Sequence, residues 1–432
     1  MLKILRNIFV GEFLVKVLQF SFEILVVKFI LVSSLPAWAI YSFILRFAPY
    51  CTFGSISYLN KFYPYYTANK DEELSRRCMD DTCSNVVIFS LLFFLIGILL
   101  LAVSFFEYAS ESLTWYSLGF LSVSLVVYYT YLQSILRNTF NFAIYIYGFV
   151  MLSLVQILVL LLFIPTLTIY SVVFSVFSAY LLCNFYYVRK LKQLGCSVFS
   201  LSFSLSAIKA GSAPFILSIS IFLMQSSDRL ALILTGDNDL LSGYVICFVF
   251  YQLGVVIVNT AGKVFSPFFL ASQEHDESTR YITLFARYFS LVFFSVFVLY
   301  YLFAAQLSSL LGQGKDIYSK EIGIYLAIGY FSSYSQIFFN KMIKLSKEGV
   351  GVTVSLFFSF LNAVAVYYFA VNGEVFLMIC VASLVVNFLY CLVTVSLSYA
   401  VDSRFKIGSN IELFSYPVAF LSLTFCLYLG GV

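Results

Sequence analysis

Long apolar runs alternate with short polar stretches along almost the whole chain. Each run has about 20 residues, the length that a helix needs to cross about 30 Å of hydrocarbon. We expect twelve membrane-spanning helices, at about residues 8–32, 37–60, 85–106, 116–136, 144–164, 168–188, 212–234, 244–262, 287–308, 322–340, 352–371 and 376–399. A thirteenth run at residues 413–430 predicts an additional C-terminal helix. The first run lacks a small-residue cleavage site, so we expect it to remain as a helix.

Composition supports this interpretation. Hydrophobic residues make up 62% of the chain and charged residues 11%, and the mean hydropathy is +0.96. This leaves too little polar surface to cover a soluble globular protein. The sequence therefore predicts an all-α fold, a polytopic transmembrane helical bundle.

One motif occurs twice, as Phe-x-Pro followed by two aromatic residues, one further residue and Ala. The first copy is at residues 62–68 and the second at residues 265–271, and an acidic cluster follows each. Gly11 and Gly211 open the helices that precede the two copies. The repetition indicates that the chain is duplicated.

The duplication predicts two six-helix halves, residues 1–205 and 206–400, followed by a linker and the thirteenth helix in residues 401–432. A unit of six crossings begins and ends on the same side of the membrane, so its duplicate has the same orientation. Such halves are related by a pseudo-two-fold axis along the membrane normal, and a central cavity between them is expected to bind substrate.

Basic residues predict the orientation, because Lys and Arg accumulate in short cytoplasmic loops. With the N-terminus in the cytoplasm, nineteen of the 25 basic residues lie in the inner segments, and only Lys315 and Lys320 lie in outer loops. Four others lie inside the apolar runs: Lys16, Lys28, Arg46 and Arg229. We therefore expect a multi-pass membrane protein with a cytoplasmic N-terminus.

The first helix carries a polar stripe. Glu12, Lys16, Gln19 and Glu23 fall on one helical face, which is unsuited to contact with lipid. One interpretation is a neutralised Glu12–Lys16 pair between helices, and the other is a cavity wall that includes Glu23. Lys28 lies near the outer end of this helix, where it either extends to the interface or binds substrate.

Arg46 lies roughly 14 Å into the second run, at 1.5 Å per residue. A cation at this depth is by default a functional candidate, for substrate binding or gating. Pro49 and Gly54 follow, and they predict a break in this helix.

Asp228 and Arg229 lie late in the seventh run and, as consecutive residues on a helix, do not face one another. They either pair with neighbouring helices, or Arg229 binds an anion while Asp228 accepts a proton or cation.

The two repeated motifs lie where the second helix of each half leaves the membrane on the inner side. Pro64 and Pro267 are therefore candidate gate or hinge residues. The alternative is that these prolines only end their helices.

Other chemistry finds little support. The single histidine, His275, lies in an acidic inner loop, and Cys78 and Cys83 without further ligands do not predict a metal site. No nucleophile and base occur together, the outer loops are short, and no feature indicates nucleic-acid binding. We expect neither enzymatic activity nor a cofactor.

The chain resembles a known family in several segments. These are Ala210 to Pro214, Ser227 to Arg229, Gly243-Tyr244, the Leu310 to Gly312 turn with Tyr318 and Glu321, and the Lys-rich turn at residues 341–347. The pattern is similar to the Wzx O-antigen flippases of the multidrug/oligosaccharidyl-lipid/polysaccharide exporter superfamily, over most of residues 5–400. The resemblance implies translocation of undecaprenyl-diphosphate-linked oligosaccharide repeat units from the cytoplasmic to the periplasmic leaflet of the bacterial inner membrane. It also implies O-antigen polymerase and the chain-length regulator as partners.

A diphosphate headgroup needs cations in a polar cavity, because it is too polar to cross hydrocarbon unaided. Four cations are candidates for binding it: Arg46, Arg229, Lys28 and Lys16. Three carboxylates are candidates for coupling to H⁺ or Na⁺: Asp228, Glu23 and Glu12. Two alternatives remain open, a multidrug exporter of the same superfamily, which would need an acidic cavity, and an integral-membrane polysaccharide polymerase.

Overall fold

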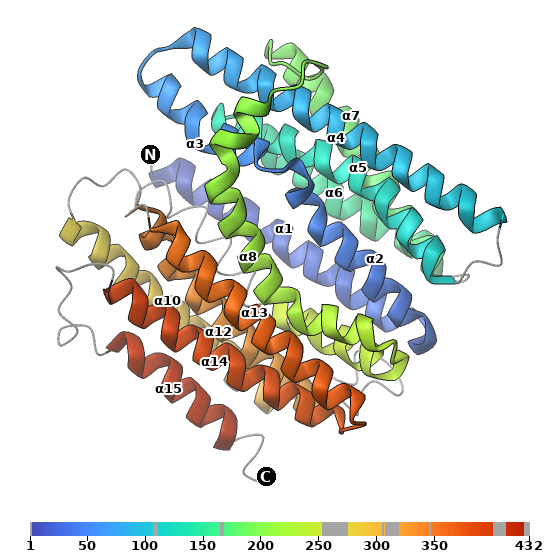
Figure 1. Ribbon diagram of the computed structural model, residues 1–432, viewed down its shortest axis with the longest axis vertical. Coiled ribbons are helices and arrows are strands. Elements are labelled where there is room, and N and C mark those ends of the chain that lie inside the picture. The colour runs from blue at the N-terminus through green and yellow to red at the C-terminus, as the bar shows by residue number, and fades with distance from the viewer. Residues whose placement is uncertain are drawn as a thin grey trace. The chain divides into compact units, whose positions relative to one another are not determined.

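The computed structural model describes residues 2–106, 111–164, 168–252, 275–304, 306, 319–344, 347–400 and 412–426. All the regular elements in these ranges are helical (Figure 1). They are α1 (Leu2–Phe29), η1 (Val32–Ser34), α2 (Leu35–Phe47), η2 (Ala48–Thr52), α3 (Ser55–Ala68), α4 (Glu72–Phe106), α5 (Glu111–Asn138), α6 (Phe142–Leu162), α7 (Ile169–Gln193), α8 (Leu205–Thr235), α10 (His275–Leu302), α12 (Ser319–Lys344), α13 (Glu348–Val371), α14 (Phe376–Ala400) and α15 (Glu412–Thr424). Residues 238–252 are also helical.

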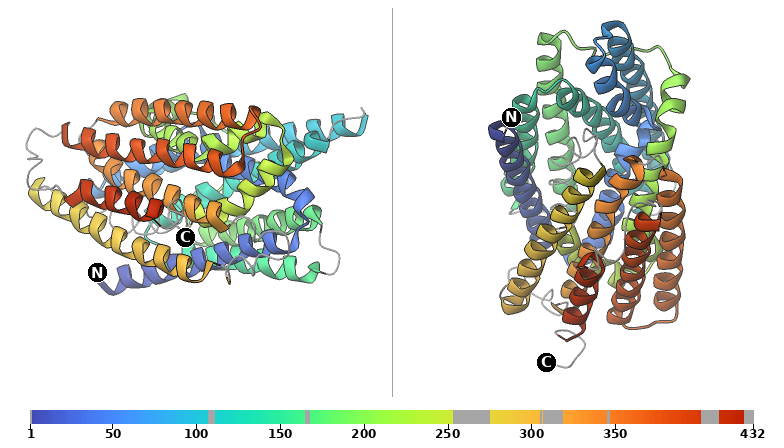
Figure 2. Two further views of the ribbon diagram at one scale, coloured as in Figure 1. Left: turned by 90° about the horizontal axis from the view of Figure 1, so that it is seen from below. Right: turned by 90° about the vertical axis from the view of Figure 1, so that its left-hand side faces the viewer.

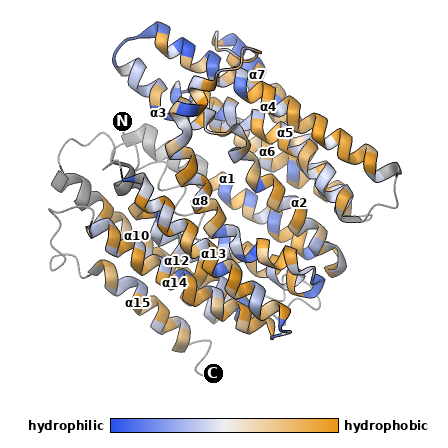
Figure 3. Ribbon diagram, in the orientation of Figure 1, coloured by the Kyte–Doolittle hydropathy of each residue, from blue (hydrophilic) through white to orange (hydrophobic). Residues whose placement is uncertain are grey.

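Eight of the described helices are long and apolar enough to cross a membrane. Their middle parts are hydrophobic, whereas hydrophilic residues gather where α3 ends and α4 begins (Figure 3). The predicted all-α, multi-pass membrane architecture is confirmed.

The chain forms two compact units. The first-half unit comprises Val17–Phe22 and Phe29–Ile219, and the second-half unit comprises Met1–Lys16, Glu23–Lys28 and Ser220–Val432. The boundaries that the sequence predicts near residues 205 and 400 remain predictions.

In the first-half unit, α5 is the central helix, in contact with α2, α3, α4, α6 and α7. Buried hydroxyl pairs tie it to its neighbours, as where the Tyr41 and Ser122 hydroxyls lie 2.9 Å apart. Asn184 of α7 donates to the Leu125 carbonyl at 3.0 Å. Such contacts satisfy polar groups away from water.

In the second-half unit, α12 has the central place, in contact with α10, α13, α14 and α15. These helices run side by side in Figures 1 and 2. Residues 322–335 of α12 are all buried, and so are residues 241–251. A helix that is buried all round belongs to the centre of its bundle.

The two units repeat the same contacts. In the first half, α4 contacts α5, α5 contacts α6 and α7, and α6 contacts α7. In the second half, α10 contacts α12, α12 contacts α13 and α14, and α13 contacts α14. The third to sixth helices of each predicted half are therefore arranged by one plan, as expected for a duplicated chain.

The predicted break in the second helix is present. The α-helix α2 ends at Phe47, the 3₁₀ turn η2 follows, and α3 begins at Ser55. Phe53 and Gly54 have positive φ angles of 46° and 92°. A left-handed backbone conformation favours glycine, as at position 54. The break that Pro49 and Gly54 predict in the second helix is confirmed.

Gly54 also allows a close helix contact. A Cβ atom at Gly211 of α8 would lie 2.0 Å from the Gly54 carbonyl oxygen and 2.8 Å from the Tyr58 nitrogen. The backbone of α8 therefore contacts the broken segment directly. Position 211 needs glycine because there is no space for a Cβ atom.

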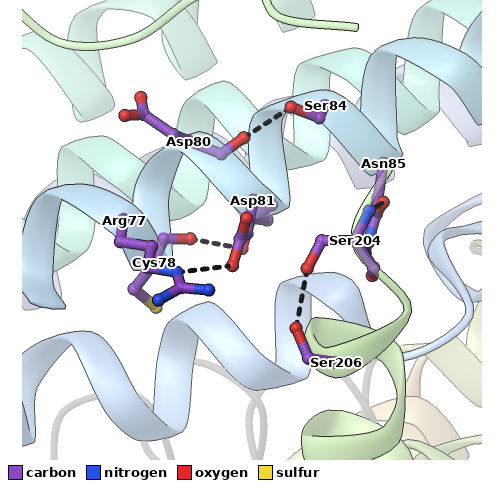
Figure 4. A network of polar contacts seen from close by, with 9 residues as sticks. Arg77, Cys78, Asp80, Asp81, Ser84, Asn85, Ser204 and Ser206 are labelled. Carbon is purple, nitrogen blue, oxygen red and sulfur yellow. Dashed lines mark hydrogen bonds and ion pairs between the residues drawn. The ribbon is translucent and has the colours of Figure 1, made fainter. Parts of the chain in front are cut away.

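Hydrogen bonds join the segment that connects α7 to α8 to side chains of α4 and α5. The Asn85 side chain donates to the Ser204 carbonyl and accepts from the Ser204 N–H, both at 2.8 Å. The Ser84 hydroxyl donates to Ser200 at 2.7 Å, and Tyr128 donates to the Val198 carbonyl at 2.6 Å. Figure 4 shows Asn85 beside Ser204, at the start of α8. These bonds fix the beginning of α8 within the first-half unit.

Candidate functional site

Asp228 and Arg229 lie inside the second-half unit, where their side chains are only 5% and 2% exposed. The Asp228 carboxylate accepts the Arg229 backbone N–H at 2.8 Å and the Tyr244 hydroxyl at 3.3 Å. Burying charges in an apolar helix is costly unless they are compensated. The negative Asp228 and the positive Arg229, which follow one another on α8, provide such compensation.

Aromatic rings surround the guanidinium group. Its central carbon lies 5.3 Å from the ring centre of Phe248 and 5.9 Å from that of Tyr244, within the range of cation–π attraction. Tyr325 of α12 meets Tyr244 edge to face, with ring centres 5.5 Å apart. Three elements thus enclose the charged residues: α8, the helix at residues 238–252, and α12.

One carboxylate oxygen and one side-chain amide oxygen on the neighbouring helices have no hydrogen-bond partner among the described residues. They are Oε2 of Glu321, in the first turn of α12, and Oδ1 of Asn362, on α13. Asn362 is 1% exposed, and its amide nitrogen donates to Ser227, next to Asp228 on α8, at 2.9 Å. Glu321 lies about one helical turn before Tyr325, whose ring meets that of Tyr244. The site therefore offers acceptor oxygens beside a buried cation.

Arg46 occupies the last turn of α2, directly before the break, and is half-buried in the first-half unit. A cation in the last turn of a helix interacts favourably with the helix dipole. The break also begins within two residues of it, as expected from the sequence. Arg46 therefore lies at the end of a short helix, and not in the middle of a continuous transmembrane helix.

The candidates on the first helix all fall in α1. Lys16 and Glu23 are half-buried, whereas Lys28 is exposed in the last turn. Glu12 lies in the same helix, and Lys16, Glu23 and Lys28 all have interactions with other residues. The roles that the sequence predicts for these four residues remain predictions.

Of the two candidate gate prolines, Pro64 is exposed inside α3, and the helix continues for four residues to Ala68. It therefore does not end the helix at its own position. Pro267 lies outside the residues that the structure describes.

Sequence reasoning did not assign a role to Tyr244, Phe248, Glu321, Tyr325 or Asn362 at this site. Asn362 carried a signal, because it is the one amide side chain in the apolar run 352–371. Tyr244 and Glu321 stood out only as parts of the family resemblance, and Phe248 and Tyr325 carried no signal, since they resemble the many other Phe and Tyr residues of the chain.

A groove opens beside this site between α8 and α13. It has a volume of about 510 Å³, and it is lined by Leu230, Ala231, Leu234, Phe360, Ala363, Val364, Tyr367, Tyr368, Val371 and Asn372. Its lining is almost wholly apolar, as expected for a surface in contact with lipid.

No protein family model matches the chain, and no curated protein matches its sequence. Its fold, in contrast, is similar to that of solved transporters. An inward-facing multidrug resistance MATE family transporter of the MOP superfamily matches with a TM-score of 0.67 and 14% identity, over 90% of this chain and 95% of that one. An outward-facing one matches with a TM-score of 0.65 and 13% identity, over 92% and 96%.

A third solved structure is a MOP superfamily transporter from Pyrococcus furiosus, whose binding pocket is described as having reverse polarity, suggesting a different function. It matches with a TM-score of 0.65 and 12% identity, over 92% of this chain and 96% of that chain. The chain therefore has the MATE-like fold of MOP superfamily transporters.

Proposed function

We propose that this protein is a flippase for undecaprenyl-diphosphate-linked polysaccharide repeat units of the O-antigen type, of the Wzx family. It would carry the repeat unit from the cytoplasmic to the periplasmic leaflet of the inner membrane. The observation that carries this proposal is the buried Arg229 in a transporter fold, held over Tyr244 and Phe248 and close to Asp228. A buried, always-charged side chain is suited to bind an anionic group such as a diphosphate.

The other cations extend this role. Arg46 beside the broken helix, with Lys16 and Lys28 on α1, would guide the headgroup, while the polyprenyl tail stays in the lipid. A headgroup of charge near −2 moves outward with the inside-negative potential, which contributes about 2.3 kcal/mol per charge per 100 mV.

Coupling to a cation belongs to the same cluster. Asp228, with Glu321 and Asn362 on the neighbouring helices, presents oxygen atoms that suit H⁺ or Na⁺. Binding of a cation there would change the compensation of Arg229 and so its affinity for the anionic headgroup. Glu12 and Glu23 on α1 are the other coupling candidates, and Pro64 and Pro267 are the candidate hinges.

The runner-up is a multidrug exporter, because two of the similar solved structures are described as multidrug resistance transporters. A cationic drug would be attracted by Asp228 and repelled by Arg229. The two functions therefore make opposite demands on Arg229.

The test uses a deletion strain of the native bacterium, with its diphosphate-linked carriers analysed by leaflet. We expect single repeat units to accumulate on the cytoplasmic leaflet. Accumulation on the outer leaflet would contradict the flippase and indicate a polymerase, and normal polymer display would contradict both. A loss of drug resistance without a polymer defect would favour the runner-up.

Complementation of the same strain tests Arg229. We expect Arg229→Met to reduce surface polymer at least about tenfold, because loss of charge-assisted bonds of about 1.5–3 kcal/mol weakens headgroup binding. Arg229→Lys should retain part of the activity.

Two controls accompany these variants. Arg229→Met leaves Asp228 buried with less compensation, so Asp228→Asn/Arg229→Met serves as a neutral pair that should insert normally and still fail to export. Arg189→Met, at an exposed position of α7, should export normally. Full export by the neutral pair would overturn the role of Arg229.

A further inference from the structure

A cluster between the middle of α3 and the C-terminal end of α5 in the first-half unit is not part of the site described above. It consists of Asn60 and Lys61 on α3 and Arg137 and Asn138 on α5, and we call it the rim cluster. The Asn138 side-chain amide donates to the Asn60 side-chain oxygen at 3.1 Å. This bond brings the two neighbouring cations, Lys61 and Arg137, to the same level of the bundle.

Both cations of the rim cluster have donors to spare. Lys61 is exposed, and its ammonium nitrogen lies 5.7 Å from the ring centre of Phe62. Arg137 is half-buried, and it donates from Nη2 to the Ser134 hydroxyl at 3.2 Å. Its buried Nε has no acceptor in the part of the chain that the structure describes. A buried N–H without an acceptor is unfavourable, so this position favours an acceptor from outside the chain.

Carboxylates do not neutralise these two cations within the described ranges. The ion pair on the neighbouring α4 joins Arg77 to Asp81 at 4.0 Å, and so occupies that carboxylate (Figure 4). Basic residues on the inner side of a membrane protein are expected from topology alone. Topology requires neither a half-buried arginine nor a paired amide beside it.

We propose that the rim cluster binds the diphosphate group of the substrate at the predicted cytoplasmic end of the first-half unit, before translocation. The inference rests on the proposed flippase function and adds a site that would act earlier than Arg229. Arg137 would supply a planar fork for the phosphate oxygens, Lys61 a mobile second charge, and the free N–H groups of the amide pair further donors. Two positive charges match the charge of a diphosphate better than that of a monophosphate.

The test measures binding of farnesyl diphosphate, a soluble probe that also carries a prenyl-linked diphosphate group. The full-length protein is placed in phosphatidylcholine nanodiscs and titrated calorimetrically, with empty nanodiscs as the blank. We expect Lys61→Gln/Arg137→Gln to bind the probe at least about tenfold more weakly, equivalent to about 1.4 kcal/mol. Arg137→Lys, which keeps the charge but loses the fork, should fall between this variant and the wild type. Farnesyl monophosphate should bind more weakly than the diphosphate, and farnesol should not distinguish the variants.

Arg76→Gln/Arg189→Gln is the matched control, since it removes two exposed cations elsewhere in the same unit. Equal weakening in this control, or no weakening in the rim variant, would overturn the inference. Loss of the probe affinity when phosphatidylglycerol is added to the nanodiscs would assign the cluster to lipid headgroups and also overturn it. If the deletion strain accumulates inner-leaflet carriers but the rim variant binds like the wild type, only this inference fails. Normal polymer display in the deletion strain would instead contradict the flippase function.

Discussion

Gly211 of α8 comes so close to Gly54 that neither residue has room for a side chain. The two glycines belong to segments far apart in the sequence, and each has its own reason to be glycine. Gly54 needs a positive φ angle, whereas Gly211 needs space. The contact lets the backbone of a transmembrane helix lie directly on the broken end of another.

We expect Gly211→Ala to destabilise the protein by about 1–3 kcal/mol, because the new methyl group would displace the backbone at Gly54. The melting temperature of the purified protein in detergent measures this effect. Gly349→Ala is the control, since a methyl group there meets nothing within 4 Å in the described structure and alanine favours helix. Equal melting temperatures for the two variants would contradict the close contact.

Some residues of the candidate functional site could be predicted from the sequence, and others could not. Asp228 and Arg229 stood out because a charge inside an apolar run has no place in lipid. Glu321 lies directly before its apolar run, at the start of a helix, where acidic residues are common. Tyr244 and Phe248 acquire meaning only from their contact with Arg229, which depends on how the helices pack.

Among the elements, the break between α2 and α3 was predictable because Pro49 and Gly54 each have a local effect on the backbone. The length of α4 was not, since its 35 residues extend the apolar run into a polar segment that the hydrophobic pattern does not register. The ends of helices depend on such polar turns, and the local sequence predicts these ends less well than it predicts the presence of a helix.

In the additional helix α15, Phe420 packs among aromatic rings of the second-half unit. Phe420 stacks on Tyr330 of α12, with ring centres 4.2 Å apart, and lies 4.8 Å from Phe297 of α10. The Tyr334 hydroxyl also donates to the Leu413 carbonyl at 2.9 Å. The helix is therefore part of the folded unit and not an independent tail.

We expect Phe420→Ala to destabilise the protein by about 3–5 kcal/mol, since it leaves a cavity among aromatic rings. Phe425→Ala, at an exposed position, should change the stability by less than about 0.5 kcal/mol. Thermal unfolding followed in detergent distinguishes the two variants. A small effect at Phe420 would mean that α15 is held elsewhere.

For the whole molecule, the duplicated pattern of contacts was foreseeable from the repeated motif and the spacing of apolar runs. The division of the chain into its two units was not, because α1 and α8 contribute residues to both. Helices shared in this way cannot be assigned to one half by hydropathy, since hydropathy does not show which other helices each part of a helix contacts.

The cytoplasmic N-terminus is a prediction for the molecule as a whole, and cysteine labelling tests it. With Cys196 and Cys426 replaced by Ser, Gln193→Cys should react with a membrane-impermeant maleimide only after the cells are opened. Asn238→Cys should react in intact cells. The reverse pattern would contradict the orientation. Introduced cysteines are preferable to Cys196, because burial raises the pKa of its thiol and so lowers the reactive thiolate fraction.

The complete burial of the middle of α12 has a consequence for how the protein is made. A helix with no lipid-facing surface has no need to be strongly apolar, and α12 contains Ser332, Ser333 and Ser335. It is not among the helices apolar enough to qualify as spans on composition. A segment of this kind partitions weakly into lipid when it leaves the ribosome. We therefore expect α12 to enter the bilayer together with α10 or α13, as a hairpin whose partner supplies the missing hydrophobicity.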